Sequence, residues 1–342
     1  MRGFPAKALA GTLFLFLASC GLGSIAWDGT TDSIEQSFNV KPGGRLTVEA
    51  DLGSIEVRAE ATDRVDVEVV RGVNATDLQR VADLRRDLRI SMNQSGNDVH
   101  VIAKLPGGHG FWAHVGNRYR LRFLITVPRV YNADLRTSGG GIEVSDLEGE
   151  VRSETSGGSL RFGEIHGPVR GRTSGGGITL QGCVGDADVE TSGGGIDIGE
   201  VEGSVRASTS GGPITIKRAQ GTVDAETSGG GIHVEEVRGA VNAETSGGGV
   251  FARLTEQPKG DCHLETSGGS IEVELAENIG VDLDAETSGG RVKVDFPVTM
   301  QGEIKSNSVR SELNGGGPEL RLRTSGGGIR VHRIGFSKAE RD

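Results

Sequence analysis

The tetrad Thr-Ser-Gly-Gly occurs ten times in this chain, first at Thr137 and last at Thr324. Six successive spacings of 18 residues are followed by two of 21 and one of 37. A worn copy at Lys305-Ser306-Asn307 divides the last interval, so that eleven units follow one another without a linker. A short fixed period is typical of stacked repeats, in which each unit buries its apolar face only against its neighbours.

Each unit contains two runs in which apolar and polar residues alternate. An aliphatic residue stands five positions after the Thr and an apolar one two positions later, as at Ile178 and Leu180. A second alternation, such as Val223-Asp224-Ala225-Glu226-Thr227, precedes the next tetrad. Alternation with period two is typical of β-strands and excludes a helix over these residues.

Two short strands cannot bury their own apolar face, so the units are expected to stack in register at about 4.8 Å per rung. This stacking places Ile178, Ile196 and Ile214 above one another and lets the inward threonines hydrogen-bond to the rungs above and below. The prediction is an all-β fold, a right-handed parallel β-solenoid of about eleven rungs of 18–21 residues. Both a two-sided and a triangular cross-section fit the pattern.

Glycine supplies 57 of the 342 residues and aromatic residues only 4%. The core must therefore be thin and built from Ile, Val, Leu and Ala. We expect positive φ angles at the glycines that mark the second turn of each unit. These are Gly149, Gly167, Gly185, Gly203, Gly221 and Gly239.

Residues 37–133 lack the tetrad but contain several strand-like runs and one amphipathic helical pattern at 75–88. Because a solenoid end exposes unpaired backbone, we predict that 37–133 form an N-terminal β-rich cap with one helix. The solenoid is then expected to span 134–336, and residues 20–36 to be a linker. At the far end, Phe336 and the charged residues 338–342 are expected to blunt the edge.

The N-terminus reads as an export signal. Arg2 and Lys7 precede a short apolar run that ends in Leu17-Ala18-Ser19-Cys20. This ending resembles the lipobox of bacterial lipoproteins, which implies a signal peptide over 1–19, lipid on Cys20 and a membrane anchor. Gly21 after the cysteine implies the outer membrane where a bacterium has one. An ordinary secretory signal with an incidental cysteine is the alternative.

The other two cysteines, Cys183 and Cys262, lie four rungs apart in the predicted stack. Four rungs amount to about 19 Å, whereas a disulfide needs Cα atoms within about 7 Å. Both are therefore predicted to be buried free thiols.

One outward column of the predicted stack is acidic. Glu226, Glu244, Glu265 and Glu286 are expected on consecutive rungs, where stacked like charges are unfavourable. We interpret them as an acidic stripe that attracts divalent cations or a basic partner; the alternative is a solvated face. A second candidate is the loop 107–114, which has two His and two aromatic residues and could form a contact loop, a weak metal site or a cover over the cap.

The Thr-Ser-Gly-Gly-Gly-Ile units, the run Leu52-Gly53-Ser54-Ile55-Glu56-Val57 and the ending Thr126-Val127-Pro128 resemble a bacterial β-strand-repeat family named "putative adhesins". The resemblance covers about 45–335 and implies export, and the family offers no catalytic motif to carry over.

The chain is therefore expected to be a lipid-anchored, extracytoplasmic module of the cell envelope with a non-catalytic binding or structural role. Its expected contacts are the membrane through Cys20 and an envelope protein or polysaccharide. A net charge of −10 argues against nucleic acid. No catalytic, cofactor-binding or metal-binding residue is assigned. The alternative is a polysaccharide lyase or hydrolase, which would need carboxylates gathered with Arg or Lys in one groove.

Overall fold

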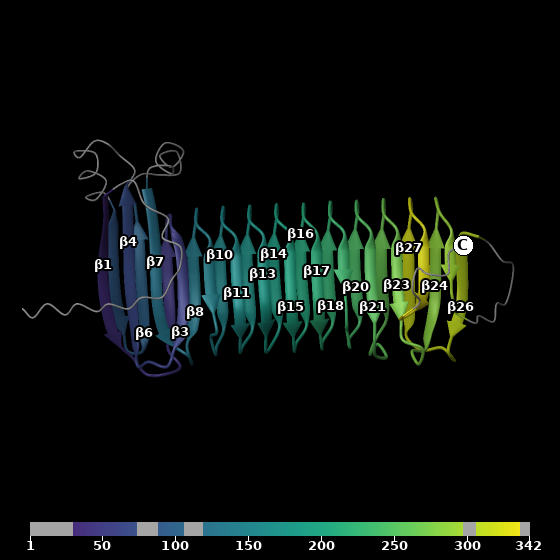
Figure 1. Cartoon of the computed structure of the whole chain (residues 1–342), viewed down its shortest axis with the longest axis horizontal. Helices are drawn as coiled ribbons and strands as arrows, with labels where there is room; N and C mark the ends of the chain where they lie inside the picture. The colour runs from purple at the N-terminus through teal and green to yellow at the C-terminus, as the bar shows by residue number, and fades with distance from the viewer. Residues whose placement is uncertain (1–29, 74–87, 106–118, 297–305, 336–342) are drawn as a thin grey trace, which may run out of the picture.

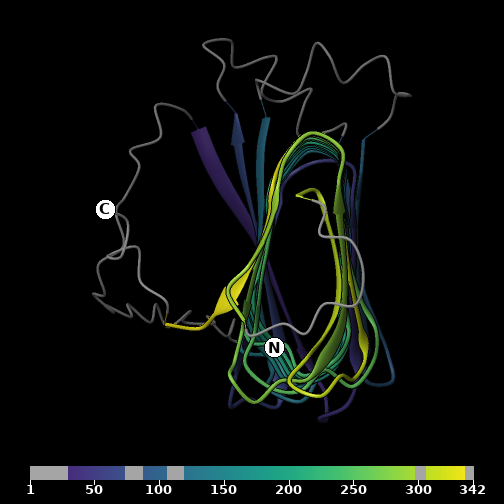
Figure 2. The same cartoon turned by 90° about the vertical axis from the view of Figure 1, so that its right-hand side faces the viewer.

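The computed structural model describes residues 30–73, 88–105, 119–296 and 306–335. In this part of the chain, 28 β-strands form two 14-stranded sheets, here called sheet A and sheet B. The sheets face each other along a rod (Figure 1), and the view down the rod shows a flattened, two-sided cross-section (Figure 2). The predicted parallel β-solenoid is confirmed, its cross-section is two-sided, and its handedness stays a prediction.

The strands follow one another in space in an order that differs from the chain order at both ends. Sheet A runs β1 (Thr30–Asn39), β4 (Arg64–Val73), β7 (Tyr119–Pro128), β3 (Ser54–Glu60), β9 (Ile142–Ser145), β11 (Leu160–Ile165), β13 (Ile178–Cys183), β15 (Ile196–Val201), β17 (Ile214–Ala219), β19 (Ile232–Val234), β21 (Val250–Leu254), β23 (Ile271–Leu275), β28 (Ile329–Arg333) and β25 (Val292–Val294). Sheet B runs β26 (Ser308–Leu313), β24 (Val281–Thr287), β27 (Glu319–Thr324), β22 (Cys262–Thr266), β20 (Val241–Thr245), β18 (Val223–Thr227), β16 (Val205–Thr209), β14 (Ala187–Thr191), β12 (Val169–Thr173), β10 (Val151–Thr155), β8 (Asn132–Thr137), β2 (Arg45–Ala50), β6 (Asp98–Lys104) and β5 (Arg89–Ser95).

One rung is a sheet B strand followed by a sheet A strand, and equivalent residues of neighbouring rungs face each other. Ile196 pairs with Ile178 on one side and with Ile214 on the other, as predicted. Their side chains are buried between the sheets. Size is adjusted locally, since Phe162 fills the space that Gly171 leaves on the opposite sheet, where an added Cβ would lie 3.1 Å from the Phe162 ring. The thin aliphatic core is therefore continuous along the rod.

The buried threonine of each tetrad is bonded to backbone. The Thr173 hydroxyl donates to the Gly158 carbonyl of the preceding rung at 2.7 Å and accepts the Gly176 N–H of its own turn at 3.4 Å. We expected bonds between neighbouring rungs, and they are present, but the partner is a glycine carbonyl. The same donor bond recurs at Thr155, Thr191, Thr209, Thr227 and Thr245.

Replacing Thr173 with valine keeps the shape of the side chain and removes this hydroxyl. The Gly158 carbonyl then loses its donor in a part-buried site, which we expect to cost about 1–3 kcal/mol of unfolding free energy in urea denaturation. Ser174→Ala is the matched control, since Ser174 is exposed, and it should change stability by less than about 0.5 kcal/mol. Equal effects of the two substitutions would contradict the role given to the buried hydroxyl.

Most of the second turns require glycine for a reason other than the positive φ angle that we expected. Only Gly149 and Gly185 have positive φ angles, of 156° and 139°. The others are held by close stacking, as at Gly167, where an added Cβ would lie 2.3 Å from the Gly149 carbonyl oxygen. The expectation of positive φ is therefore wrong at Gly167, Gly203, Gly221 and Gly239.

At the N-terminal end the parallel pairing continues past the expected boundary at residue 134. Strand β2 is parallel to both β8 and β6, and β3 is parallel to both β9 and β7. The rung β2–β3 thus lies inside the rung β6–β7, although it comes first in the chain. Antiparallel strands β5, β4 and β1 close this end, and β1 includes 30–36, which were expected to be linker. The predicted helix lies outside the described residues except for Leu88, which is buried.

At the C-terminal end the order of rungs also departs from the chain order. The last rung, β27–β28, lies between β22–β23 and β24–β25, as the yellow β27 in Figure 1 shows. The worn copy at Ser306-Asn307 leads into β26, which is antiparallel to β24. The expected sequential order of eleven parallel units is therefore wrong at this end. The predicted blunting residues 336–342 lie outside the described residues.

Both remaining cysteines match their prediction. Cys183 and Cys262 are buried and neither forms a disulfide.

Candidate functional site

The outward face of sheet B carries two columns of mostly charged side chains. The five-residue strands β10 to β22 of this sheet have inward residues at their first, third and fifth positions and outward residues between them, as in β18 with Asp224 and Glu226 outward. Because the rungs are in register, the outward residues of successive strands lie beside one another at about 4.8 Å. The order of outward charges along the sequence therefore determines the order of charges along this flat surface.

In the middle of the rod this pattern alternates in sign. Arg172 lies 3.5 Å from Glu190 on the next strand, and Arg206 lies 3.2 Å from Asp224. Exposed pairs of this kind each contribute no more than about 1 kcal/mol, but like charges at the same positions would repel. The alternation favours this stacking order.

The alternation stops over β18, β20 and β22. Glu226 faces Glu244, which in turn faces Glu265, and all three side chains are exposed. Within the described part of the chain, Glu226 and Glu244 have no hydrogen bond or ion pair, whereas Glu265 lies 3.1 Å from His263. These three glutamates are called the acidic stripe below.

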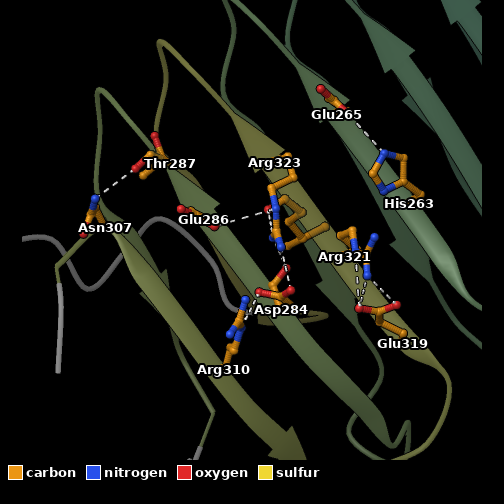
Figure 3. Close-up of polar contacts among 11 residues, drawn as sticks. His263, Glu265, Asp284, Glu286, Thr287, Asn307, Arg310, Glu319, Arg321 and Arg323 are labelled. Carbon is orange, nitrogen blue, oxygen red and sulfur yellow. Dashed lines mark hydrogen bonds and ion pairs between the residues drawn. The ribbon is translucent and has the colours of Figure 1, made fainter. Parts of the chain in front are cut away.

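Glu286 does not continue the acidic stripe. Strand β27 intervenes, so Arg323 faces Glu265 on one side and Glu286 on the other. Figure 3 shows the Arg323 side chain directed toward Glu286 and Asp284, with Glu265 joined to His263. The expectation of four consecutive glutamates is therefore wrong, because β27, which comes from the last repeat of the chain, places Arg323 between Glu265 and Glu286.

On β24, Asp284 binds two arginines. Its carboxylate lies 2.5 Å from Arg323 and 3.1 Å from Arg310, as Figure 3 shows. Burial raises the pKa of Asp284, but hydrogen bonds from the two guanidinium groups outweigh it, so the pKa lies below its usual value. This carboxylate is therefore ionised and fully occupied at neutral pH.

A second cluster lies on the outward face of sheet A. The rings of His233 and Phe251 stack with centroids 4.4 Å apart, and the Arg253 guanidinium lies 5.7 Å from the Phe251 centroid. Arg253 also binds Glu274 at 2.5 Å, and a hydrogen bond with His233 lowers the pKa of Glu235. We did not anticipate this cluster; its signal was Phe251, an aromatic residue at an outward position.

A hollow of about 490 Å³ lies over the second turns in the middle of the rod. Gly182 stands between Glu164 and Glu200 in register, and the Glu164 carboxylate occupies the space that a side chain at Gly182 would need, since an added Cβ would lie 2.4 Å from Glu164 Oε2. Arg218 lies 2.9 Å from Glu200 and 2.7 Å from Glu236, so it holds two of the lining carboxylates. Four glutamates and two arginines line this hollow.

The model of the family described as Toastrack DUF4097 matches residues 44–332. The chain belongs to the Toastrack family. This match agrees with the resemblance found in the repeat units. It also covers the rungs at both ends of the rod whose spatial order differs from their order in the chain.

Several solved structures are similar to this Toastrack chain at low identity. A "putative adhesin" from Parabacteroides merdae is 11% identical, with 90% of this chain and 98% of that chain covered and a TM-score of 0.43. A "putative adhesin" from Bacteroides fragilis is 13% identical, with 89% and 97% covered and a TM-score of 0.29. A "putative lipid binding protein" from Parabacteroides distasonis is 13% identical, with 90% and 98% covered and a TM-score of 0.34. Comparison with the curated proteins gave no match.

The sequence-predicted sites of this Toastrack chain have three outcomes. The structure brings Glu226, Glu244 and Glu265 together and separates Glu286 from them. Cys20 and the loop 107–114 lie outside the described residues. In the described ranges no group of three or more side chains is placed to hold a metal ion, and no helix is long and apolar enough to cross a membrane.

Proposed function

We propose that this chain is a non-catalytic surface module of the bacterial envelope, a rod that binds through its flat faces. The observation that supports this proposal is the register of the rungs, which repeats outward side chains at one spacing along both sheets. A partner with evenly spaced groups can engage many such sites at once, and multivalent contact strengthens binding without a deep pocket.

We propose further that lipid on Cys20 anchors the rod to a membrane, the outer membrane where there is one. Strand β1 begins at Thr30, ten positions after Cys20, at the N-terminal end of the rod. A tether of ten residues reaches at most about 35 Å, so the rod would be held by one end.

Anchoring is tested by replacing Cys20 with alanine and following labelled fatty acid and membrane fractionation. The wild type should take up label and sediment with membranes, and Cys20→Ala should do neither. Cys183→Val is the control, because Cys183 is buried in the rod and should leave labelling unchanged. Label that persists in Cys20→Ala would contradict the anchor.

We propose the acidic stripe as the contact face for a basic partner. Its carboxylates are exposed, adjacent and, at Glu226 and Glu244, free of ion pairs within the described residues. The probe is poly-lysine, with calcium as a separate arm, measured by calorimetry at low salt where exposed charges are least screened. The variant Glu226→Gln/Glu244→Gln/Glu265→Gln should bind poly-lysine at least ten-fold more weakly.

The control for the stripe removes charge elsewhere on the same face. Glu154 and Glu190 lie beside Arg172 in register, and Glu154→Gln/Glu190→Gln should keep most of the affinity. If both variants weaken poly-lysine binding equally, the acidic stripe is only part of a diffuse negative surface. If calcium binds and poly-lysine does not, the stripe is a cation site.

A polysaccharide-cleaving enzyme is the second candidate, and the hollow lined by Glu164, Glu200, Glu202 and Glu236 favours it. Carboxylates gathered around a cavity are what glycoside hydrolysis or elimination requires. Glu164→Gln and Glu200→Gln should each abolish release of reducing ends from envelope polysaccharide if the hollow is catalytic. Absence of such release from the wild type leaves the binding module as the function.

A further inference from the structure

The last rung of the chain, residues 319–333, is not the last rung of the rod. It occupies a slot between the rungs β22–β23 and β24–β25, which both precede it in the sequence. Strand β27 pairs with β22 and β24, and β28 pairs with β23 and β25. In the chain, β24, β25 and β26 come before this final rung, but in the rod the final rung lies closer to the middle than they do. This rung has a ladder partner on both sides in both sheets.

The inward residues do not explain this choice of slot. Leu320, Leu322 and Thr324 point inward in β27 just as Leu283, Ala285 and Thr287 do in β24. The tetrad bonds continue through either order, since Thr324 donates to Gly269 and Thr287 donates to Gly327. Core packing of this kind would be available to β24 directly on β22, so the apolar pattern is interchangeable between the two rungs.

The outward charges do distinguish the two orders. Residues 319–333 contain four Arg and a single Glu, whereas 262–277 contain four Glu and no Lys or Arg. On the other side of the slot, β24 presents Asp282, Asp284 and Glu286. If β24 stacked on β22 with the tetrads in register, Glu265 would face Glu286. Stacked carboxylates repel, so the sequential order is disfavoured.

The contacts across the slot match this charge difference on sheet B and, on sheet A, on the side of β23, whereas Lys293 of β25 faces Arg330. On sheet B, Arg323 lies 2.5 Å from Asp284 and also donates to the Asp284 carbonyl at 2.8 Å. On sheet A, His332 lies 3.0 Å from Glu272, and Arg333 lies 3.2 Å from Glu277. The Asp284 and His332 side chains are only 16% and 8% exposed, so these pairs are weakly screened by solvent.

We propose that residues 319–333 are a basic latch: they enter the slot between two acidic rungs after those rungs have formed, and their arginines select that slot. The latch is made last during synthesis, and its partners on β22 lie more than 50 residues earlier in the chain. Contacts this distant in sequence form after local ones, because loop closure costs entropy before they contribute.

The latch is tested by cutting the full chain beside it. A protease recognition sequence is inserted after Gly315, where an added Cβ would meet nothing within 4 Å and the turn is exposed. The uncut protein must first show the same thermal midpoint and circular dichroism as the wild type. After cutting, retention of the fragment that begins at Gly316 is followed by gel filtration.

The proposal predicts that the cut wild-type fragment stays bound and that Arg323→Glu releases it at least ten-fold faster. Arg152→Glu is the matched control, with the same change of charge on the same face in β10, and it should release the fragment at the wild-type rate. Equal release rates for Arg323→Glu and the wild type would overturn the role of the arginines. Immediate loss of the wild-type fragment would overturn the latch itself.

Discussion

Replacing Gly176 with alanine is expected to destabilise the rod by about 3 kcal/mol or more. An added Cβ at this position would lie 2.2 Å from the Gly158 carbonyl oxygen of the preceding rung, far inside van der Waals contact. The obstacle is backbone, which cannot move without disturbing the ladders on either side. The measurement is urea denaturation followed by far-ultraviolet circular dichroism.

The neighbouring glycine provides the control for this prediction. An added Cβ at Gly175 would lie 3.4 Å from the Gly157 carbonyl oxygen, an ordinary contact, and Gly175 is exposed. Gly175→Ala should therefore change stability by less than about 0.5 kcal/mol. If both alanine variants unfold at the same urea concentration, close stacking is not the reason for the glycine pair.

The second large effect concerns Cys183 at alkaline pH. Burial, and then the negative charges of Asp186, Glu164 and Glu202, raise the pKa of this thiol to about 12. An unfolded chain ionises its thiol near pH 8.5–9, so the folded state is penalised only above that range. Its stability is intact below about pH 8.5 and should fall as pH rises towards 12, by about 1.4 kcal/mol per pH unit at most.

The variant Cys183→Val isolates this contribution, because Val201 occupies the facing position on the next rung. The difference in unfolding free energy between wild type and variant should shift by about 2 kcal/mol between pH 9 and pH 10.5, in favour of the variant. Titrations of other groups are common to both proteins and cancel in the difference. A difference that stays constant over this range would contradict the raised pKa.

The sequence determined the stacking in the middle of the rod for a simple physical reason. Every unit there has the same length, so one shift of 18 residues aligns its inward residues, threonines and turns together, as at Ile178, Ile196 and Ile214. The same argument placed Cys183 and Cys262 apart and inside. Burial and period two were sufficient for these predictions.

The order of rungs at the ends could not follow from that pattern, because interchangeable inward residues fit either order. The signal lay in the outward residues, where Arg321 and Arg323 interrupt a run of acidic units. Comparing the possible orders by the number of like charges they stack would have favoured the observed one over the sequential one. At the N-terminal end, β2–β3 and β6–β7 lack the tetrad that would have announced them as rungs.

The candidate site was predicted in part for the same reason. The acidic stripe follows from three successive in-register units, whereas the position of Glu286 depends on a return of the chain that no local pattern encodes. The stacked pair of His233 and Phe251 was not predicted, because the charge pattern of the outward positions does not indicate which rings stack across neighbouring strands.

At the two ends of the rod the spatial order of the rungs differs from their order in the chain, whereas the central units follow the chain order. The number of central units can therefore change without altering either end. Units between β10 and β21 contact only neighbours of the same two-strand architecture, so adding or removing one would keep both ends intact. Each extra unit would lengthen the molecule by about 4.8 Å. Duplication of central units thus gives this architecture an adjustable ruler, whose two finished termini stay constant while the reach between them varies.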